Sequence, residues 1–169
     1  MVTQDDIQNN LLQSVEQVDR MAEIIKNMRL LARTDEQYMS EIVNINDIVR
    51  YPFSILGSQL KVHNIDVLID MPLHRILIMG NSNRLQQVIV NLVVNARDSL
   101  FARQEQETGF KPWLKINGWT EKETGIAVIV ISDNGIGIKP EDINKLFEPF
   151  YTTRDKEHRT GLGLAISME

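Results

Sequence analysis

The chain has 169 residues, of which 43% are hydrophobic and 24% charged, and these values predict a folded core rather than disorder. Its net charge of -5 and isoelectric point near 5.3 argue against general binding to nucleic acid or to an anionic membrane. The absence of cysteine excludes disulfides, thiolate metal sites and cysteine nucleophiles. No apolar run is long enough to cross a bilayer and no signal peptide precedes the fold, so we expect a soluble, cytoplasmic unit.

The N-terminal segment predicts one long amphipathic helix. Between Ile7 and Leu31 the apolar residues recur at steps of three and four, which is typical of a bundle or coiled-coil face. A polar break follows at Arg33 to Gln37. We therefore expect residues 1–34 to form a separate helical segment and residues 35–169 to form a domain. A helix packed on its own domain is the alternative, which the breadth of the apolar stripe disfavours.

Beyond residue 34 the chain alternates between helical and strand patterns. We predict helices at 46–61 and 83–104, the second capped by the GNSN run at 80–83. Strands are predicted at 65–70, 75–79, 113–120 and 126–131, and the EKETG run between the last two has the composition of a hairpin turn. This order indicates an α/β (α+β) two-layer sandwich in which a sheet packs on helices.

The predicted helix at 83–104 has a core face and a compact polar face. At about 100° per residue, one side carries Leu85, Val88, Ile89, Leu92 and Ala96. The polar residues beside them are Arg84, Gln87, Asn91, Asn95 and Asp98. A polar face is common to all surface helices and is the simpler interpretation. However, asparagines are poor helix formers, so two of them four residues apart call for another explanation. An amide oxygen can coordinate a magnesium ion whose remaining ligands are water and phosphate oxygens, so the face also suits a metal–phosphate site.

A glycine-rich loop follows the last predicted strand, in VIVISDNGIGI. Gly135 and Gly137 allow positive φ and close backbone approach, and the strand would deliver Asp133 to a cavity. A carboxylate there can accept a hydrogen bond from an exocyclic amino group such as that of adenine, whereas a base with a carbonyl in that place would leave oxygens unpaired. A simple Asp-Asn-Gly turn is the alternative.

The C-terminal part predicts two further features. PEDINKLFEPF has a proline and acidic residues at its start and predicts a helix that ends before Pro149. The polar loop that follows carries Arg154, Lys156 and Arg159, and a helix beginning near Leu162 would offer backbone N–H groups to an anion. Glycine-led helix starts and mixed charge runs are also common without such a function.

Four motifs occur in a fixed order, namely NLVVNARDSL, DNGIGI, LFEPFYTT and TGLGLAIS. They resemble, in that order, the N, G1, F and G2 boxes of sensor histidine kinase catalytic domains, which belong to the gyrase, chaperone, kinase and mismatch-repair ATPase superfamily. The NARDSL and EPFYTT variants look like the nitrogen-regulation type of sensor kinase. The N-terminal helix is similar to the second helix of that family's dimerisation and phosphotransfer hairpin.

The resemblance implies a Bergerat-type fold that binds ATP and Mg²⁺ between the helix of the N box and a mobile lid. By motif position, Asn95 matches the magnesium ligand, Asn91 the polar residue one turn before it, and Asp133 the adenine-reading carboxylate. Arg154 keeps a cation near the phosphates, so Asn91, Asn95 and Arg154 are the catalytic candidates. The other nucleotide-binding candidates are Asp98, Gly135, Gly137, the lid residues Phe147 and Phe150, and Thr160, Gly161, Leu162 and Gly163 of the phosphate loop.

The residue at 91 separates two chemistries within this superfamily. Its ATPases typically carry a glutamate there that activates water, and an amide cannot take a proton, so hydrolysis should be slow. We therefore predict a protein-histidine kinase domain that positions the γ-phosphoryl group with magnesium. The alternatives are a superfamily ATPase and a non-catalytic, kinase-like dimerisation or docking module.

Several family features are missing or altered. None of His63, His74 and His158 fits the phosphoacceptor motif, so we expect that helix upstream of Met1 and the closing strands beyond Glu169. Arg159 replaces the usual glycine before the phosphate loop, which puts nucleotide affinity in question. The resemblance further implies a homodimer formed through the N-terminal helix, a response-regulator receiver domain as partner, and a parent protein that is membrane-anchored in some members.

Overall fold

The computed structural model describes residues 40–152 and 161–168. These residues belong to two compact parts, residues 40–141 and residues 142–152 with 161–168. The helix expected at 7–31 and the boundary expected at residue 34 lie outside the described residues. Within the described ranges, no helix is both long enough and apolar enough to cross a membrane.

A mixed three-stranded sheet forms one layer of the larger part. It consists of β2 (Asp66–Asp70), β4 (Trp113–Thr120) and β5 (Ala127–Asp133), in the order β2-β4-β5. β4 pairs in parallel with β2 and antiparallel with β5. The hairpin between β4 and β5 is closed by backbone bonds from Glu121 to Ile126 and from Gly125 to Glu121, with φ of 71° at Gly125. The predicted hairpin and mixed sheet are confirmed.

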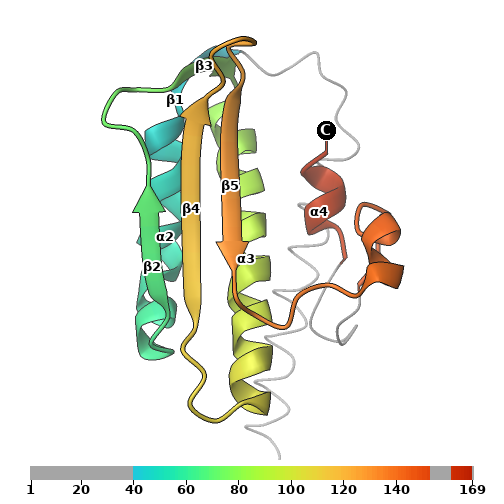
Figure 1. Ribbon diagram of the computed structural model, residues 1–169. Helices are drawn as coiled ribbons and strands as arrows, with labels where there is room; N and C mark the ends of the chain where they lie inside the picture. The colour runs from blue at the N-terminus through green and yellow to red at the C-terminus, as the bar shows by residue number, and fades with distance from the viewer. Residues whose placement is uncertain (1–39, 153–160, 169) are drawn as a thin grey trace, which may run out of the picture. The chain divides into compact units, whose positions relative to one another are not determined.

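Two long helices form the second layer, α2 (Ile45–Val62) and α3 (Ser82–Gln106). They lie side by side behind the sheet in Figure 1. Each begins at an asparagine whose side chain accepts a backbone N–H, Asn44 for α2 and Asn81 for α3. Both helices match the predicted ranges to within two residues, which confirms the two-layer α/β (α+β) sandwich.

The core fills the space between the sheet and the helices. In β4 the residues that face the helices, Leu114, Ile116 and Gly118, are buried, as the alternation of a half-covered sheet requires. On α3 the buried apolar residues are Ile89, Val93, Ala96 and Leu100. The core stripe is therefore rotated from the predicted one, because Val93 is fully buried while Val88 and Leu92 are only half-buried. The rotation follows from α3 packing on both α2 and the sheet.

Four short elements differ from prediction. β1 (Glu41–Asn44) was not predicted, and it pairs antiparallel with β3 (Leu77–Gly80), which begins two residues later than expected. The helix expected from Pro140 onward is a 3-10 helix, η2 (Pro140–Lys145), and buries none of its residues. Without a buried apolar face, little tertiary packing supports a longer α-helix there. The last helix, α4 (Gly163–Ile166), starts one residue after the predicted position.

Candidate nucleotide site

Asp133 is the last residue of β5 and pairs with the buried Leu114, so its side chain lies on the helix-facing side of the sheet. Its Oδ1 accepts the backbone N–H of Gly135 at 2.8 Å. The turn interpretation is therefore correct for one carboxylate oxygen. No other hydrogen bond to Asp133 is found in the described part of the chain, which leaves Oδ2 to accept a bond from a ligand.

Gly135 is seated directly on α3. A Cβ atom at this position would lie 2.5 Å from the backbone carbon of Ser99, which is an overlap. The backbone N–H of Ile136 also bonds to the carbonyl oxygen of Ser99, at 3.2 Å. Close approach of the loop to the helix thus requires glycine at 135, as the sequence predicted, although the partner Ser99 was not foreseen. Gly137 has open space around it and a φ of 71°, so its requirement is conformational.

Asn134 and Arg103 hold this loop in place, and neither was predicted. The Asn134 side chain accepts the backbone N–H of Trp113 at 2.8 Å and donates to the carbonyl oxygen of Lys111 at 2.9 Å. Arg103 in the last turn of α3 donates to the carbonyl oxygen of Asn134 at 2.7 Å. The only sequence signal was an asparagine in a turn, because its partners lie more than twenty residues away in the chain.

Asn91 and Asn95 are half-buried on α3. With Ser99 they are spaced by four residues, so the three lie on one side of the helix on successive turns. Since Ser99 contacts Gly135, this side of α3 leads to the loop that carries Asp133. No cluster of three or more His, Cys, Asp or Glu suited to a metal occurs in the described ranges. A magnesium ion here would need the Asn95 amide oxygen together with phosphate and water oxygens, a donor set that this ion accepts.

Asp98 is engaged by its neighbour Arg97. The Arg97 guanidinium lies 2.8 Å and 2.7 Å from Asp98 Oδ1 through Nε and Nη2, and its Nη1 donates to Gln59 Oε1 on α2 at 2.7 Å. Both charged side chains are largely covered, and burial lowers the pKa of Arg97 below its ordinary value. Asp98 therefore orients the Arg97 side chain that joins α3 to α2, and the assignment of Asp98 to nucleotide binding stays a prediction.

The smaller part contains the end of the predicted lid and the phosphate loop. Phe150 and Gly161 both have a φ of 65°, and the Phe150 N–H donates to the Gly161 carbonyl oxygen at 3.1 Å. A Cβ at Gly161 would lie 2.5 Å from the Phe150 backbone carbon, so glycine is required for this close pairing. The hydroxyl of Tyr151 donates to Asp142 Oδ1 at 2.5 Å. Two backbone segments of the F and G2 boxes are thereby held together.

Of the remaining predicted residues, some are exposed, one is buried and some lie outside the described residues. Phe147 and Phe150 are exposed, and their assignment to a lid stays a prediction. Leu162 is fully buried and precedes Gly163, the first residue of α4. Arg154 and Thr160 lie outside the described residues, as do the two other cations of that loop.

Comparison with known proteins identifies relatives of this chain. Residues 80–169 match the protein family described as histidine kinase-, DNA gyrase B- and HSP90-like ATPase. The two-component sensor PprA of Pseudomonas aeruginosa is 37% identical over 122 residues, which cover 67% of this chain and 12% of PprA. Sporulation kinase A of Bacillus subtilis is 29% identical over 151 residues, which cover 89% of this chain and 23% of that kinase. The chain therefore spans only a minor part of the length of these relatives.

Solved structures share the fold. The catalytic domain of histidine kinase ThkA superposes with a TM-score of 0.60 at 27% sequence identity, over 75% of this chain and 77% of the ThkA chain. The family match covers more than half of the chain and contains all four motifs, including the Asn91–Asn95 helix and the Asp133 loop. The chain belongs to the histidine kinase-, DNA gyrase B- and HSP90-like ATPase family.

Proposed function

We propose that this chain is the ATP–Mg²⁺-binding catalytic domain of a two-component sensor histidine kinase, which transfers the γ-phosphoryl group to a histidine outside this fragment. The observation that carries the proposal is the seating of Gly135 on Ser99. It brings the loop that holds Asp133 against the same helix that carries Asn91 and Asn95. This arrangement supports the assignment of base recognition to Asp133 and of metal binding to the polar side of α3, because both then belong to one packed unit.

Base recognition is assigned to Asp133. Because Gly135 fixes Oδ1 at 2.8 Å, the carboxylate has one preferred orientation and presents Oδ2 as an acceptor. An exocyclic amino group satisfies that oxygen, whereas the carbonyl of guanine would face it acceptor to acceptor. The resulting preference for adenine over guanine depends on the carboxylate. An asparagine amide at position 133 can also donate a hydrogen bond, so it would not keep this preference.

Metal and phosphate chemistry is assigned to α3 and the phosphate loop. When bound, magnesium screens the charge of the transferring phosphoryl group. The amide of Asn95 is suited to orient the ion, and Asn91 one turn earlier offers hydrogen bonds without a base. This lack of a base favours phosphoryl transfer to an imidazole over the activation of water. Thr160 to Gly163 and Arg154 are the proposed phosphate contacts, and Phe147 and Phe150 the proposed lid.

The proposal extends to the intact protein. By analogy with its sensor-kinase relatives, the parent forms a homodimer through the N-terminal helix, receives a signal in another domain, and passes the phosphoryl group to a response-regulator receiver domain in the cytoplasm. The similarity to PprA and to sporulation kinase A supports this assignment.

Calorimetric titration with a non-hydrolysable ATP analogue tests the nucleotide site. We expect magnesium-dependent binding of the ATP analogue at least about fivefold tighter than that of the matching GTP analogue, since an acceptor left without a hydrogen-bond donor costs roughly 1–3 kcal/mol. Asp133→Asn should remove this preference, whereas Asp70→Asn, at the other end and on the other face of the sheet, should not.

The magnesium assignment has its own control. Asn95→Ala should abolish the magnesium dependence of binding, while Asn83→Ala at the exposed start of α3 leaves it intact. Equal binding of the two analogues would contradict the base assignment. Steady phosphate release by the fragment that survives Asn95→Ala would contradict both the metal site and the kinase assignment.

A further inference from the structure

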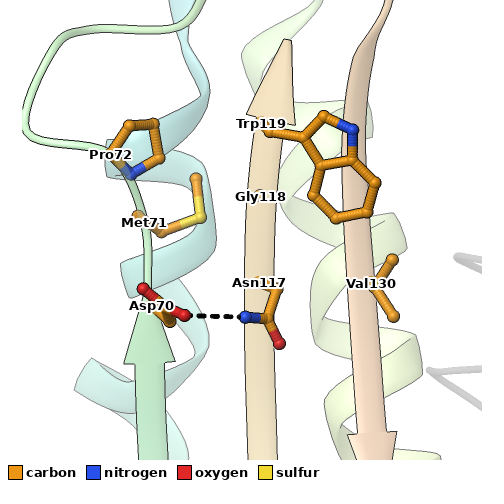
Figure 2. Close-up of a pocket in the computed structure, with 7 residues that line it drawn as sticks. All are labelled: Asp70, Met71, Pro72, Asn117, Gly118, Trp119 and Val130. Atoms are coloured by element: carbon orange, nitrogen blue, oxygen red, sulfur yellow. Dashed lines mark hydrogen bonds between the residues drawn. The ribbon is translucent and has the colours of Figure 1, made fainter. Parts of the chain in front are cut away.

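The sheet contains a groove that the nucleotide site does not use (Figure 2). β2 and β4 pair in register up to Asp70 and Asn117, and β2 then ends while β4 continues to Thr120 beside β5. Beyond this point a groove of about 540 Å³ is lined by the residues that follow Asp70, by β4 and by Val130 of β5. It lies at the end of the sheet opposite to Asp133.

One end of the groove carries a carboxylate. Asp70 Oδ2 accepts a hydrogen bond from Asn117 Nδ2 at 3.0 Å, shown as the dashed line in Figure 2. Asp70 makes no ion pair with a cation in residues 40–152 or 161–168. The Asn117 bond orients the carboxylate without neutralising it, so a negative charge is held at the edge of the groove.

The rest of the groove is aromatic and aliphatic. The indole of Trp119 is 46% exposed, and Figure 2 shows it on the β5 side, with Met71 on the β2 side of Gly118. A Cβ at Gly118 would lie 2.5 Å from Met71 Sδ, so glycine at 118 is what allows the thioether to form the floor. Val130 and Pro72 complete the apolar lining.

We propose that this groove, lined by Asp70, Met71, Pro72, Gly118, Trp119 and Val130, binds an arginine side chain from a segment of a partner protein. A guanidinium can stack on the Trp119 face and donate to Asp70 at the same time, while the aliphatic stem packs on the apolar lining. An anionic ligand is disfavoured by Asp70 and by the net charge of -5. Arginine fits better than lysine because a planar group satisfies the aromatic face and the carboxylate together.

A protein segment fits better than a small cation because the exposed apolar surface extends beyond the groove. Leu68 and Trp113 lie on the same face of the sheet as Asp70 and Trp119, and both are exposed. Exposed apolar residues rimmed by charged ones mark protein contact surfaces. The partner segment would therefore place apolar residues beside its arginine.

A tryptophan fluorescence titration tests this assignment on the 169-residue chain. The chain has two tryptophans, so Trp113→Phe leaves Trp119 as the only reporter. The probes are acetyl-leucyl-arginyl-leucine amide and its neutral isostere with citrulline in place of arginine. We expect the arginine peptide to give a saturable fluorescence response, with an affinity roughly fivefold higher than that of the citrulline peptide. Added salt should weaken binding of the arginine peptide, as for a partly exposed charge pair.

Variants of the two aspartates on β2 provide matched controls. Asp70→Asn retains an acceptor for Asn117 and should reduce affinity for the arginine peptide about fivefold, as loss of one partly exposed pair implies. Asp66→Asn, on the same strand and face but outside the groove, should have no effect. Calorimetry on Trp119→Leu in the otherwise unchanged chain should also show weaker binding.

Three outcomes would overturn the assignment. They are equal responses to both peptides, an undiminished response in Asp70→Asn, and a Trp119 signal that follows protein concentration without peptide. The last outcome would show that a second copy of the chain covers this face. ATP-analogue affinity measured in parallel should be unchanged by Asp70→Asn, so failure of this proposal is distinct from failure of the nucleotide site.

Discussion

The guanidinium of Arg103 donates from Nη1 to the backbone oxygen of Asn134 at 2.7 Å and thereby joins the last turn of α3 to the loop after Asp133. The same guanidinium bonds to Glu107 at 2.9 Å and lies over the ring of Phe110, 4.5 Å from its centroid. Three contacts fix Arg103, so the Asn134 carbonyl is held at a defined position. Arg103 acts through Asp133 and is a positioning residue for the proposed nucleotide site.

Arg103→Ala should weaken binding of the ATP analogue about threefold to tenfold while the chain stays folded, because a charge-assisted hydrogen bond to the loop is lost. Hydrogen exchange should also speed up at the Gly135 amide, which bonds to Asp133. A purely global destabilisation would instead speed exchange throughout the core. Arg50→Ala, at an exposed position on α2, is the control and should change neither measurement.

Three glycine-to-alanine substitutions distinguish the effect of steric overlap from the effect of a positive φ on stability. Gly135→Ala should lower the free energy of unfolding by roughly 1–3 kcal/mol because its Cβ overlaps the Ser99 backbone. Gly137→Ala has room and should lose only about 1 kcal/mol, from its positive φ. Gly57→Ala in the interior of α2 has open space and should gain about 0.5–1 kcal/mol.

Urea unfolding measures all three. The expected order of stability is Gly57→Ala, the unchanged chain, Gly137→Ala, then Gly135→Ala. A Gly135→Ala chain as stable as Gly137→Ala would show that the loop can move away from Ser99, which would remove the contact on which the proposed nucleotide scaffold depends.

Tyr151→Phe tests the contact that holds the end of the proposed lid. Loss of the hydrogen bond to Asp142 should speed hydrogen exchange at the Phe150 and Tyr151 amides by roughly tenfold, since bonds to charged groups are worth about 1.5–3 kcal/mol. The α2 and α3 amides should keep their exchange rates. Tyr51→Phe on α2 is the matched control, and an equal effect from both variants would contradict a local role for Tyr151.

Elements with a strong local signal could be predicted from the sequence, and elements that depend on distant pairing could not. α3 has its own cap at Asn81 and a long periodic pattern, so its limits were close to those predicted. β1 has four residues, two of them exposed, and is a strand because Ile42 and Val43 pair with Met79 and Ile78 in β3. No pattern within residues 41–44 reveals that partner.

The same distinction applies to the site. The glycines and the carboxylate of the Asp133 loop were predicted because close approach and turn chemistry depend on residue type alone. The contacts of Asn134 with Lys111 and Trp113, and of Gly135 with Ser99, arise only when β4, β5 and α3 come together. Residues that position the site are therefore harder to predict than residues that would touch the ligand.

Arg97 contributes to the stability of the chain and to the dependence of that stability on pH. It bonds to Asp98 within α3 and to Gln59 on α2, so Arg97→Ala should cost roughly 2–4 kcal/mol by removing the guanidinium that pairs with the covered Asp98 carboxylate. Arg97→Lys keeps the positive charge but loses the planar guanidinium that reaches both partners. It should therefore lower the free energy of unfolding by less than Arg97→Ala does. Urea unfolding of both variants at neutral pH measures the difference.

The pH dependence follows from the lowered pKa of Arg97, which burial causes. A cation whose pKa is lower in the folded chain than in the unfolded chain opposes folding while it is charged, and stability rises as the pH passes through the folded-state value. For arginine that range lies far above neutrality, so the unchanged chain should show no such rise between pH 8 and 10. The difference in unfolding free energy between the unchanged chain and Arg97→Ala should therefore stay constant from pH 8 to 10, because the guanidinium keeps its charge and its bond to Asp98 there. A difference that shrinks across that interval would contradict a charged Arg97.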